Sequence, residues 1–245
     1  MASLWRPLQW LWRALWLDPG VYEEMRDDNN PFVEGAFLLV MLALLVSVAG
    51  LIGTIVEWAA VPRLNDIKEA VYQGLVQMSW YQNLEQVAGA AFVEQFRRQY
   101  DLGWRIFPAL FGAPLPGLAL ARVVWTPAWW IVTWLAYGVL AHVVARLVGG
   151  QASLSQTLGV VALGSAPRLL NVASVVPFLS VGGVVGVWML ICRYMGLRIA
   201  HELSWPRALL ATIVPLIVLA AAAFLLAMMA LVIAGPWLAR LAMGG

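Results

Sequence analysis

The stretch that decides the fold runs from Gly35 to Val56 and reads GAFLLVMLALLVSVAGLIGTIV. It carries no charged side chain, and a glutamate stands just beyond each end, at Glu34 and Glu57. A helix rises 1.5 Å per residue, so a stretch of this length is enough to cross a hydrocarbon core of about 30 Å. The pattern therefore predicts a transmembrane helix over residues 32–58.

The composition of the whole chain supports solvation by lipid. Of 245 residues, 62% are hydrophobic and 11% are charged, and the mean hydropathy is +0.82. Soluble domains are about 45–50% apolar and about 25% charged, so a soluble fold could not hide this much apolar surface. The net charge of +2, with Lys68 as the only lysine, does not indicate a nucleic-acid partner. The single cysteine, Cys192, excludes an intramolecular disulfide.

Four more apolar stretches follow the first, and each is long enough to span a membrane. They predict helices over about 123–148, 154–176, 178–200 and 208–234. Gly149 and Gly150 are expected to end the second span, and Pro177 to separate the third from the fourth. Pro167 is expected to break the third span near its middle. The predicted fold class is all-α: a polytopic membrane bundle of about five transmembrane helices.

The first 30 residues predict an amphipathic helix. On a helix over residues 4–16, leucines and tryptophans share one arc, while two arginines and a glutamine fall on another. We expect residues 1–30 to form an interfacial segment that Trp5, Trp12 and Trp16 anchor in the headgroup region. The alternative is a leader that docks on the protein itself.

The rest of the chain, residues 31–245, is expected to form one membrane domain with an insertion. Residues 61–122 form a connection too long to lack structure, and apolar residues recur at helical spacing between 84 and 96. We expect extramembrane helices there, with 65–81 as the partner of the helix that follows. The Pro- and Gly-rich stretch over 103–116 predicts a segment at the membrane surface whose helical structure is interrupted.

Basic residues near the short loops predict the orientation of the chain. They are Arg146, Arg193, Arg198 and Arg207, and the turn near Pro177 has none. Loops rich in arginine and lysine stay on the cytoplasmic side. This places the N-terminus in the cytoplasm, and the odd number of spans places the C-terminus outside.

The hydrolytic patterns that come nearest in this sequence fail on spacing. His201 and Glu202 begin like a zinc-protease helix, but the second histidine is replaced by Trp205. Ser165 follows a glycine, yet no second glycine completes a nucleophile elbow. No Gly-rich loop with a lysine forms a phosphate cradle. We therefore expect no enzymatic activity, no metal and no cofactor.

Polar groups at membrane depth are the remaining candidates for function. An arginine near the centre of a span costs about 2.5–3.5 kcal/mol on insertion scales, so Arg168 should face the bundle or a wet cavity. The candidate intramembrane cluster is His142, Arg146, Arg168, Arg198, His201 and Glu202. The alternative is that Arg168 snorkels or lies in a shallow span, and that the other residues are interface anchors. Gly182 and Gly186 form a GxxxG pattern that favours close helix packing.

Several stretches, taken in order, resemble bacterial members of the Yip family, the Rab-interacting membrane proteins. The clearest is Ala141 to Ser155, AHVVARLVGGQASLS, followed by GVVALGSAPRLL from Gly159 and GLRIAHELS from Gly196. Trp188 to Arg193 and the stretch LDPGVYEEM from Leu17 also fit. The resemblance implies a five-span bundle with a cytoplasmic N-terminus. It also implies a role as a membrane adaptor, which eukaryotic members perform for small GTPases and vesicle traffic.

The chain departs from the family pattern in three places. The acidic, tyrosine-containing motif before the first span is not visible, and Val160 stands where the family tends to have a tyrosine. The insertion over 61–122 is also longer than usual. The first two departures put GTPase binding in doubt.

Two functions follow as hypotheses. The first is a non-enzymatic scaffold or adaptor in a bacterial plasma (inner) membrane, which binds other membrane proteins or shapes the bilayer, with homo-oligomers possible. The second is a transporter or lipid-moving protein that uses the polar cluster around Arg168 as a wet path.

Overall fold

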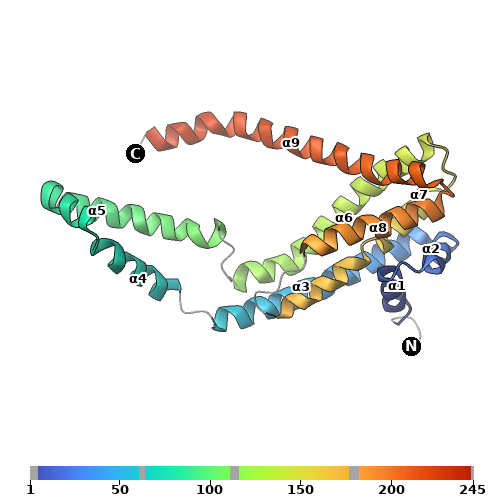
Figure 1. Cartoon of the computed structure of the whole chain (residues 1–245), viewed down its shortest axis with the longest axis horizontal. Helices are drawn as coiled ribbons and strands as arrows, with labels where there is room; N and C mark the ends of the chain where they lie inside the picture. The colour runs from blue at the N-terminus through green and yellow to red at the C-terminus, as the bar shows by residue number, and fades with distance from the viewer. Residues whose placement is uncertain (1–4, 61–63, 111–115, 177–181, 244–245) are drawn as a thin grey trace. The chain divides into compact units, whose positions relative to one another are not determined.

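The computed structural model describes residues 5–60, 64–110, 116–176 and 182–243, and this part of the chain is all-α (Figure 1). The helices are α1 Trp5–Leu15, α2 Pro19–Arg26, α3 Pro31–Ala60, α4 Leu64–Val76, α5 Ser79–Leu110, α6 Pro116–Leu147, α7 Leu154–Leu163, the 3-10 helix η1 Ala166–Val175, α8 Gly182–Ala200 and α9 Trp205–Met243. The predicted fold class is therefore confirmed.

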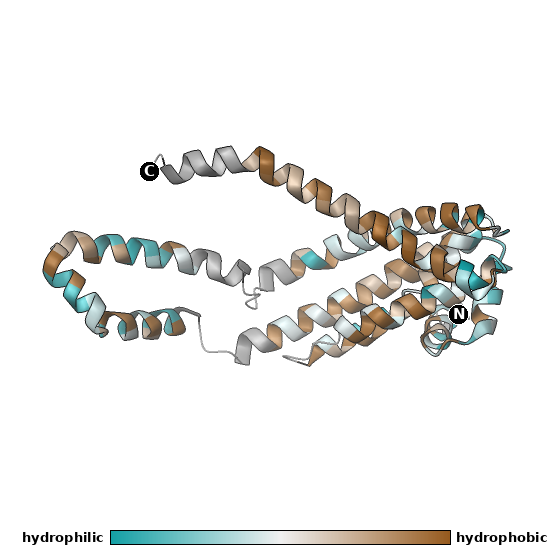
Figure 2. Cartoon of the chain, turned by 45° about the horizontal axis from the view of Figure 1, so that its top comes forward, coloured by the Kyte–Doolittle hydropathy of each residue, from teal (hydrophilic) through white to brown (hydrophobic). Residues whose placement is uncertain are grey.

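Within the described residues, five segments are long and apolar enough to cross a membrane. They are Pro31–Val56, Leu120–Leu147, Leu154–Val175, Gly182–Ala200 and Trp205–Ala234. Each matches a predicted span to within a few residues. Hydrophobic residues cover most of α9 in Figure 2, whereas hydrophilic ones are frequent on α4 and α5.

The chain divides into two compact units. The first consists of residues 1–46, 125–172 and 181–245, and the second of residues 47–124 and 173–180. In the first unit α7 is the central helix, because all of its residues from Thr157 to Leu163 are buried. A capping box between Ser153 and Gln156 starts α7 by satisfying backbone N–H groups at its N-terminus.

Glycines let the neighbouring helices approach α7 closely. A Cβ on Gly35 of α3 would lie 3.0 Å from the Cα of Gly159, and a Cβ on Gly196 of α8 would lie 3.1 Å from the carbonyl oxygen of Val160. On α6, a Cβ on Gly138 would overlap the side chain of Leu158. In a bilayer no hydrophobic effect drives helices together, so their association depends on van der Waals packing. Close approach at glycines increases that packing contact.

The third predicted span is not one straight α-helix. The α-helix ends at Leu163, and a turn at Gly164 and Ser165 leads into η1. Pro167, the second residue of η1, accounts for the break: it has no N–H to donate to the carbonyl four residues earlier, and its ring would clash with that carbonyl. The predicted break at Pro177 lies outside the described residues.

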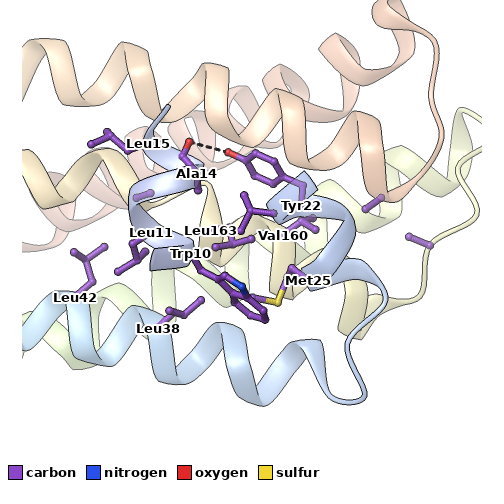
Figure 3. Close-up of a cluster of buried hydrophobic side chains, with 14 residues drawn as sticks. Trp10, Leu11, Ala14, Leu15, Tyr22, Met25, Leu38, Leu42, Val160 and Leu163 are labelled. Carbon is purple, nitrogen blue, oxygen red and sulfur yellow. Dashed lines mark hydrogen bonds between the residues drawn. The ribbon is translucent and has the colours of Figure 1, made fainter. Parts of the chain in front are cut away.

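The N-terminal helix is amphipathic as predicted, and one side of it docks on the protein, as the alternative interpretation held. Figure 3 shows its buried side chains, Trp10, Leu11, Ala14 and Leu15, in a cluster with residues of α2, α3 and α7. The indole nitrogen of Trp188 in α8 donates to the carbonyl oxygen of Leu15 over 2.7 Å.

Other residues of α1 point away from this cluster. Leu8, Trp12 and Trp16 are 37%, 53% and 66% exposed. The side chain of Trp5 lies outside the part that is described. Membrane anchoring by these tryptophans stays a prediction.

In the second unit, α4 and α5 pack through aromatic side chains. The ring of Tyr72 on α4 lies 5.2 Å from that of Tyr100 on α5, and Tyr100 donates to the carbonyl oxygen of Lys68 over 2.5 Å. Arg97 of α5 pairs with Glu69 of α4 at 3.1 Å. The helical pairing expected in the insertion is thus present. The stretch expected to be broken over 103–116 is instead helical up to Leu110, where α5 ends, and its residues 111–115 lie outside the described part.

Candidate functional site

Five of the six residues of the predicted polar cluster separate into two groups within the first unit. His142, Arg146, His201 and Glu202 lie where the end of α6, the start of α7 and the end of α8 meet. Arg168 contacts Trp130 of α6, which precedes His142 by 12 residues, or about 18 Å along a helix.

A threonine on α7 joins the two histidines. The hydroxyl oxygen of Thr157 lies 2.9 Å from Nδ1 of His142 and 2.9 Å from Nε2 of His201. The same hydroxyl donates to the carbonyl oxygen of Ser153 over 2.8 Å. Thr157 and His201 are both buried. The His142–Thr157–His201 chain therefore ties together the three helices that carry these residues.

The hydrogen-bond pattern fixes the tautomers of the two histidines. A hydroxyl has one proton, and that of Thr157 goes to the carbonyl of Ser153. Thr157 must then accept from both rings, so His142 carries its proton on Nδ1 and His201 on Nε2. Nδ1 of His201 is left as a bare lone pair, and in the described part of the chain it has no hydrogen-bond partner.

The surroundings of His201 keep its ring neutral. Burial, with the nearby His142 and Arg146 as smaller causes, lowers the pKa of His201 from its ordinary value of 6.5 to about 4. Gly150 packs against the ring, where a Cβ would lie 2.5 Å from Nδ1. A glycine at this position therefore leaves room for the imidazole. This group has the character of a structural clamp.

The charged residues beside this clamp hold loops and the N-terminal helices. Arg146 donates through Nη1 to the carbonyl oxygens of Gly150, at 3.2 Å, and Gln151, at 3.3 Å. These bonds close the turn after α6, where Gly149 has a φ of +98° that a glycine adopts readily. Glu202 pairs with Arg26 of α2 at 3.8 Å. Arg198, by contrast, is an exposed residue of α8.

The second polar group is a pair of arginines, Arg168 and Arg193. The guanidinium carbon of Arg168 lies 3.9 Å from the ring centre of Trp130, and that of Arg193 lies 4.2 Å from the ring centre of Tyr137. The two rings are seven residues apart on α6, so they share one face of that helix. Arg193 is only 7% exposed, and its Nε has no hydrogen-bond partner among the described residues.

The burial of Arg193 changes the evidence for orientation. Its position in the sequence places Arg193 with the arginines near the short loops, but in the structure it lies inside α8 and is covered by other residues. The remaining arginines of that count are Arg146, Arg198 and Arg207, which are exposed and lie within or beside the loops after α6 and α8.

The glycines of the predicted GxxxG pattern make no close packing contact in this structure. Gly182 and Gly186 are exposed, and a Cβ on either would meet no described atom within 4 Å. Packing there stays a prediction that would require another chain.

Sequence reasoning missed the residues that organise both groups. Thr157 resembles any small polar residue of an apolar helix, and only the fold places it between two histidines. Arg193 did carry a signal, because it is a charged residue inside a predicted span. Within the described residues, no three histidine, cysteine, aspartate or glutamate side chains gather to hold a metal ion.

Comparison with models of protein families gives a match over most of the chain. A family model described as the Yip1 domain matches residues 13–228, from the second half of α1 into α9. No curated protein and no solved structure matches the chain.

Proposed function

The chain belongs to the Yip family of membrane proteins, and from this premise we propose that it is a non-enzymatic scaffold or adaptor. It binds other membrane proteins or organises the bilayer around it. The observation that carries this proposal is the N-terminal helix, which is docked on the bundle with two tryptophans exposed.

The docking of α1 supports a preformed binding surface. Leu11 and Ala14 are fully buried, and Trp188 donates to the carbonyl oxygen of Leu15. On the outer side, the rings of Trp12 and Trp16 pack edge to face with centroids 5.9 Å apart. A surface held in place loses little conformational entropy when a partner binds. Tryptophan is also among the residues that contribute most to binding interfaces.

The basic residues support a cytoplasmic position for this surface. Gln156 at the start of α7 donates to the carbonyl oxygen of Arg26, and Arg26 pairs with Glu202 after α8. The N-terminal helices thus lie at the same end of the first unit as the loops that Arg146 and Arg207 flank. By the positive-inside rule this end faces the cytoplasm of a bacterial plasma membrane.

The test compares partner recovery by full-length variants purified in mild detergent. We expect Trp12→Ala with Trp16→Ala to lose a stoichiometric partner that the unaltered chain retains. The matched control is Trp129→Ala on α6, because that tryptophan is also 53% exposed. Equal recovery by all three proteins, or a wild-type chain that purifies alone, would refute the proposal.

The second candidate function, transport or lipid movement through the polar cluster, has a narrower basis. His142 and His201 are tied to Thr157 and lie apart from Arg168, so the six residues do not form one continuous group. The arginine pair alone favours this candidate. Arg168→Leu should then abolish flux in proteoliposomes while the fold is retained, and unchanged flux would exclude it.

A further inference from the structure

Arg168 and Arg193 lie in membrane-spanning segments, and among the described residues they have no counter-charge. In the part of the chain that is described, neither forms a salt bridge. Ionised groups in such segments are costly unless they are paired, and they usually mark a functional site. Two like charges in one unit add repulsion to that cost. A bound anion would remove both the cost of the unpaired charges and the repulsion between them.

The aromatic contacts leave the hydrogen-bonding edges of both guanidiniums available. A ring attracts the flat face of a guanidinium through its quadrupole, but it offers no acceptor in the plane of the N–H groups. Arg193 shows the consequence, since its Nε is buried and has no hydrogen-bond partner in the described part of the chain. The planar fork of arginine donors matches the oxygens of a phosphate group, which binds in a bidentate manner.

The backbone around Arg193 holds its side chain in place. A Cβ on Gly164, in the turn between α7 and η1, would lie 2.6 Å from Cγ of Arg193 and 3.1 Å from its Cα. No residue larger than glycine fits without moving that stem. Tyr137, which lies under the guanidinium, is itself held by a hydrogen bond from its hydroxyl to the carbonyl oxygen of Thr212 at 3.1 Å. The donors are thus positioned before any ligand arrives.

We propose that Arg168 and Arg193 bind the phosphate group of an anionic molecule, with a bilayer phospholipid as its source. Arg168 is partly exposed on a segment that lipid surrounds, so among anions a phospholipid is the one that can approach its exposed side. Arg193 lies seven residues before Ala200, about 10 Å inside the end of its span, and its long stem shortens the path to the interface. Binding a lipid is independent of the scaffold role.

The test measures bound lipid on the purified full-length chain by native mass spectrometry. The probes are phosphatidylglycerol, phosphatidylcholine with the same acyl chains, and inorganic phosphate. We expect one phosphatidylglycerol per chain to be retained, at least about tenfold more tightly than phosphatidylcholine. Arg168→Gln and Arg193→Gln should each weaken retention at least about tenfold, and Arg168→Lys should weaken it less than Arg168→Gln.

The matched control is Arg198→Gln, which removes an exposed arginine from the same helix as Arg193 and should retain the lipid. Equal losses in Arg168→Gln and Arg198→Gln would mean that the lipid is held only by general surface charge, which overturns the proposal. Absence of any retained anion also overturns it. Binding of inorganic phosphate with the same dependence on both arginines, but of no lipid, would support the site and refute the lipid source.

Arg193→Gln is the variant at risk of misfolding, because its side chain is buried. Circular dichroism and gel filtration identify that case. The partly exposed Arg168 then decides the question, since Arg168→Gln leaves the stem of Arg193 and its contact with Gly164 in place.

Discussion

Replacing Leu11 with alanine should release the N-terminal helix from the bundle. Leu11 is fully buried and belongs to the cluster of Figure 3, which also contains residues of α2, α3 and α7. Leucine loses three carbon atoms in this change, worth about 0.8 kcal/mol each in transfer, and the cavity left behind adds to the cost. Buried leucine-to-alanine changes accordingly cost about 2–5 kcal/mol.

The affected equilibrium is the docking of α1, so the assay is amide hydrogen exchange along the chain in detergent. A cost of about 2 kcal/mol or more raises the open population at least about thirtyfold, since about 1.4 kcal/mol corresponds to a factor of ten. Exchange should accelerate by that factor over Trp5–Leu15 and much less over α7. This pattern is expected because a docked terminal helix opens locally before the bundle unfolds.

The same helix provides the control. Leu8 is 37% exposed, so Leu8→Ala removes the same atoms with little loss of packing and should leave the exchange of α1 nearly unchanged. If Leu11→Ala left the exchange of α1 at the wild-type rate, or if both variants raised it equally, the docked position of α1 would be wrong.

Three further predictions concern the polar clamp and one close helix contact. Thr157→Val should lower thermal stability by about 1–3 kcal/mol, because two ring N–H groups lose their acceptor, and Thr157→Ser should restore most of it in a melting assay. The folded protein holds the pKa of His201 near 4, below its ordinary 6.5, so the unfolded chain binds more protons between these values. The contribution of His201 to stability should therefore be full above pH 6.5 and fall from there towards pH 4. A His201→Gln variant whose melting temperature fell as steeply as that of the wild-type chain over this range would contradict the prediction. Gly53→Ala should lower the melting temperature, because the added Cβ would overlap the carbonyl oxygen of Ser174. Gly50→Ala is the control and should have little effect, because a Cβ there would lie 3.8 Å from the hydroxyl oxygen of Ser174.

The agreement between expected and observed spans has a simple physical basis. A membrane segment must satisfy its own backbone hydrogen bonds and bury an apolar length of about 30 Å, so composition and length nearly decide its position. The segments Pro31–Val56 and Trp205–Ala234 follow from this alone. The break after Leu163 was also visible in the sequence, because a proline four residues later cannot continue an α-helix.

The polar residues were harder to place, because their partners come from other helices. His142 and His201 looked like members of one cluster with Arg168, yet the contact that joins the two rings is Thr157, a residue with no signal of its own. Arg193 looked like a loop charge because it lies near the end of α8. In the structure, the turn at Gly164 packs against the side chain of Arg193, and α6 covers the guanidinium of Arg193 with the ring of Tyr137.

By itself the sequence determined that the chain is a helical membrane protein of the Yip type, with about five spans and an amphipathic start. These properties depend on the hydrophobicity of each residue and on the order of residues along the chain, and both can be read directly from the sequence. The tertiary structure alone decided that α1 buries Leu11 against the bundle and that Arg168 and Arg193 pack against aromatic rings on one face of α6. Such contacts depend on the angles and rotations at which helices pack, and those angles arise from many weak interactions between residues far apart in the chain.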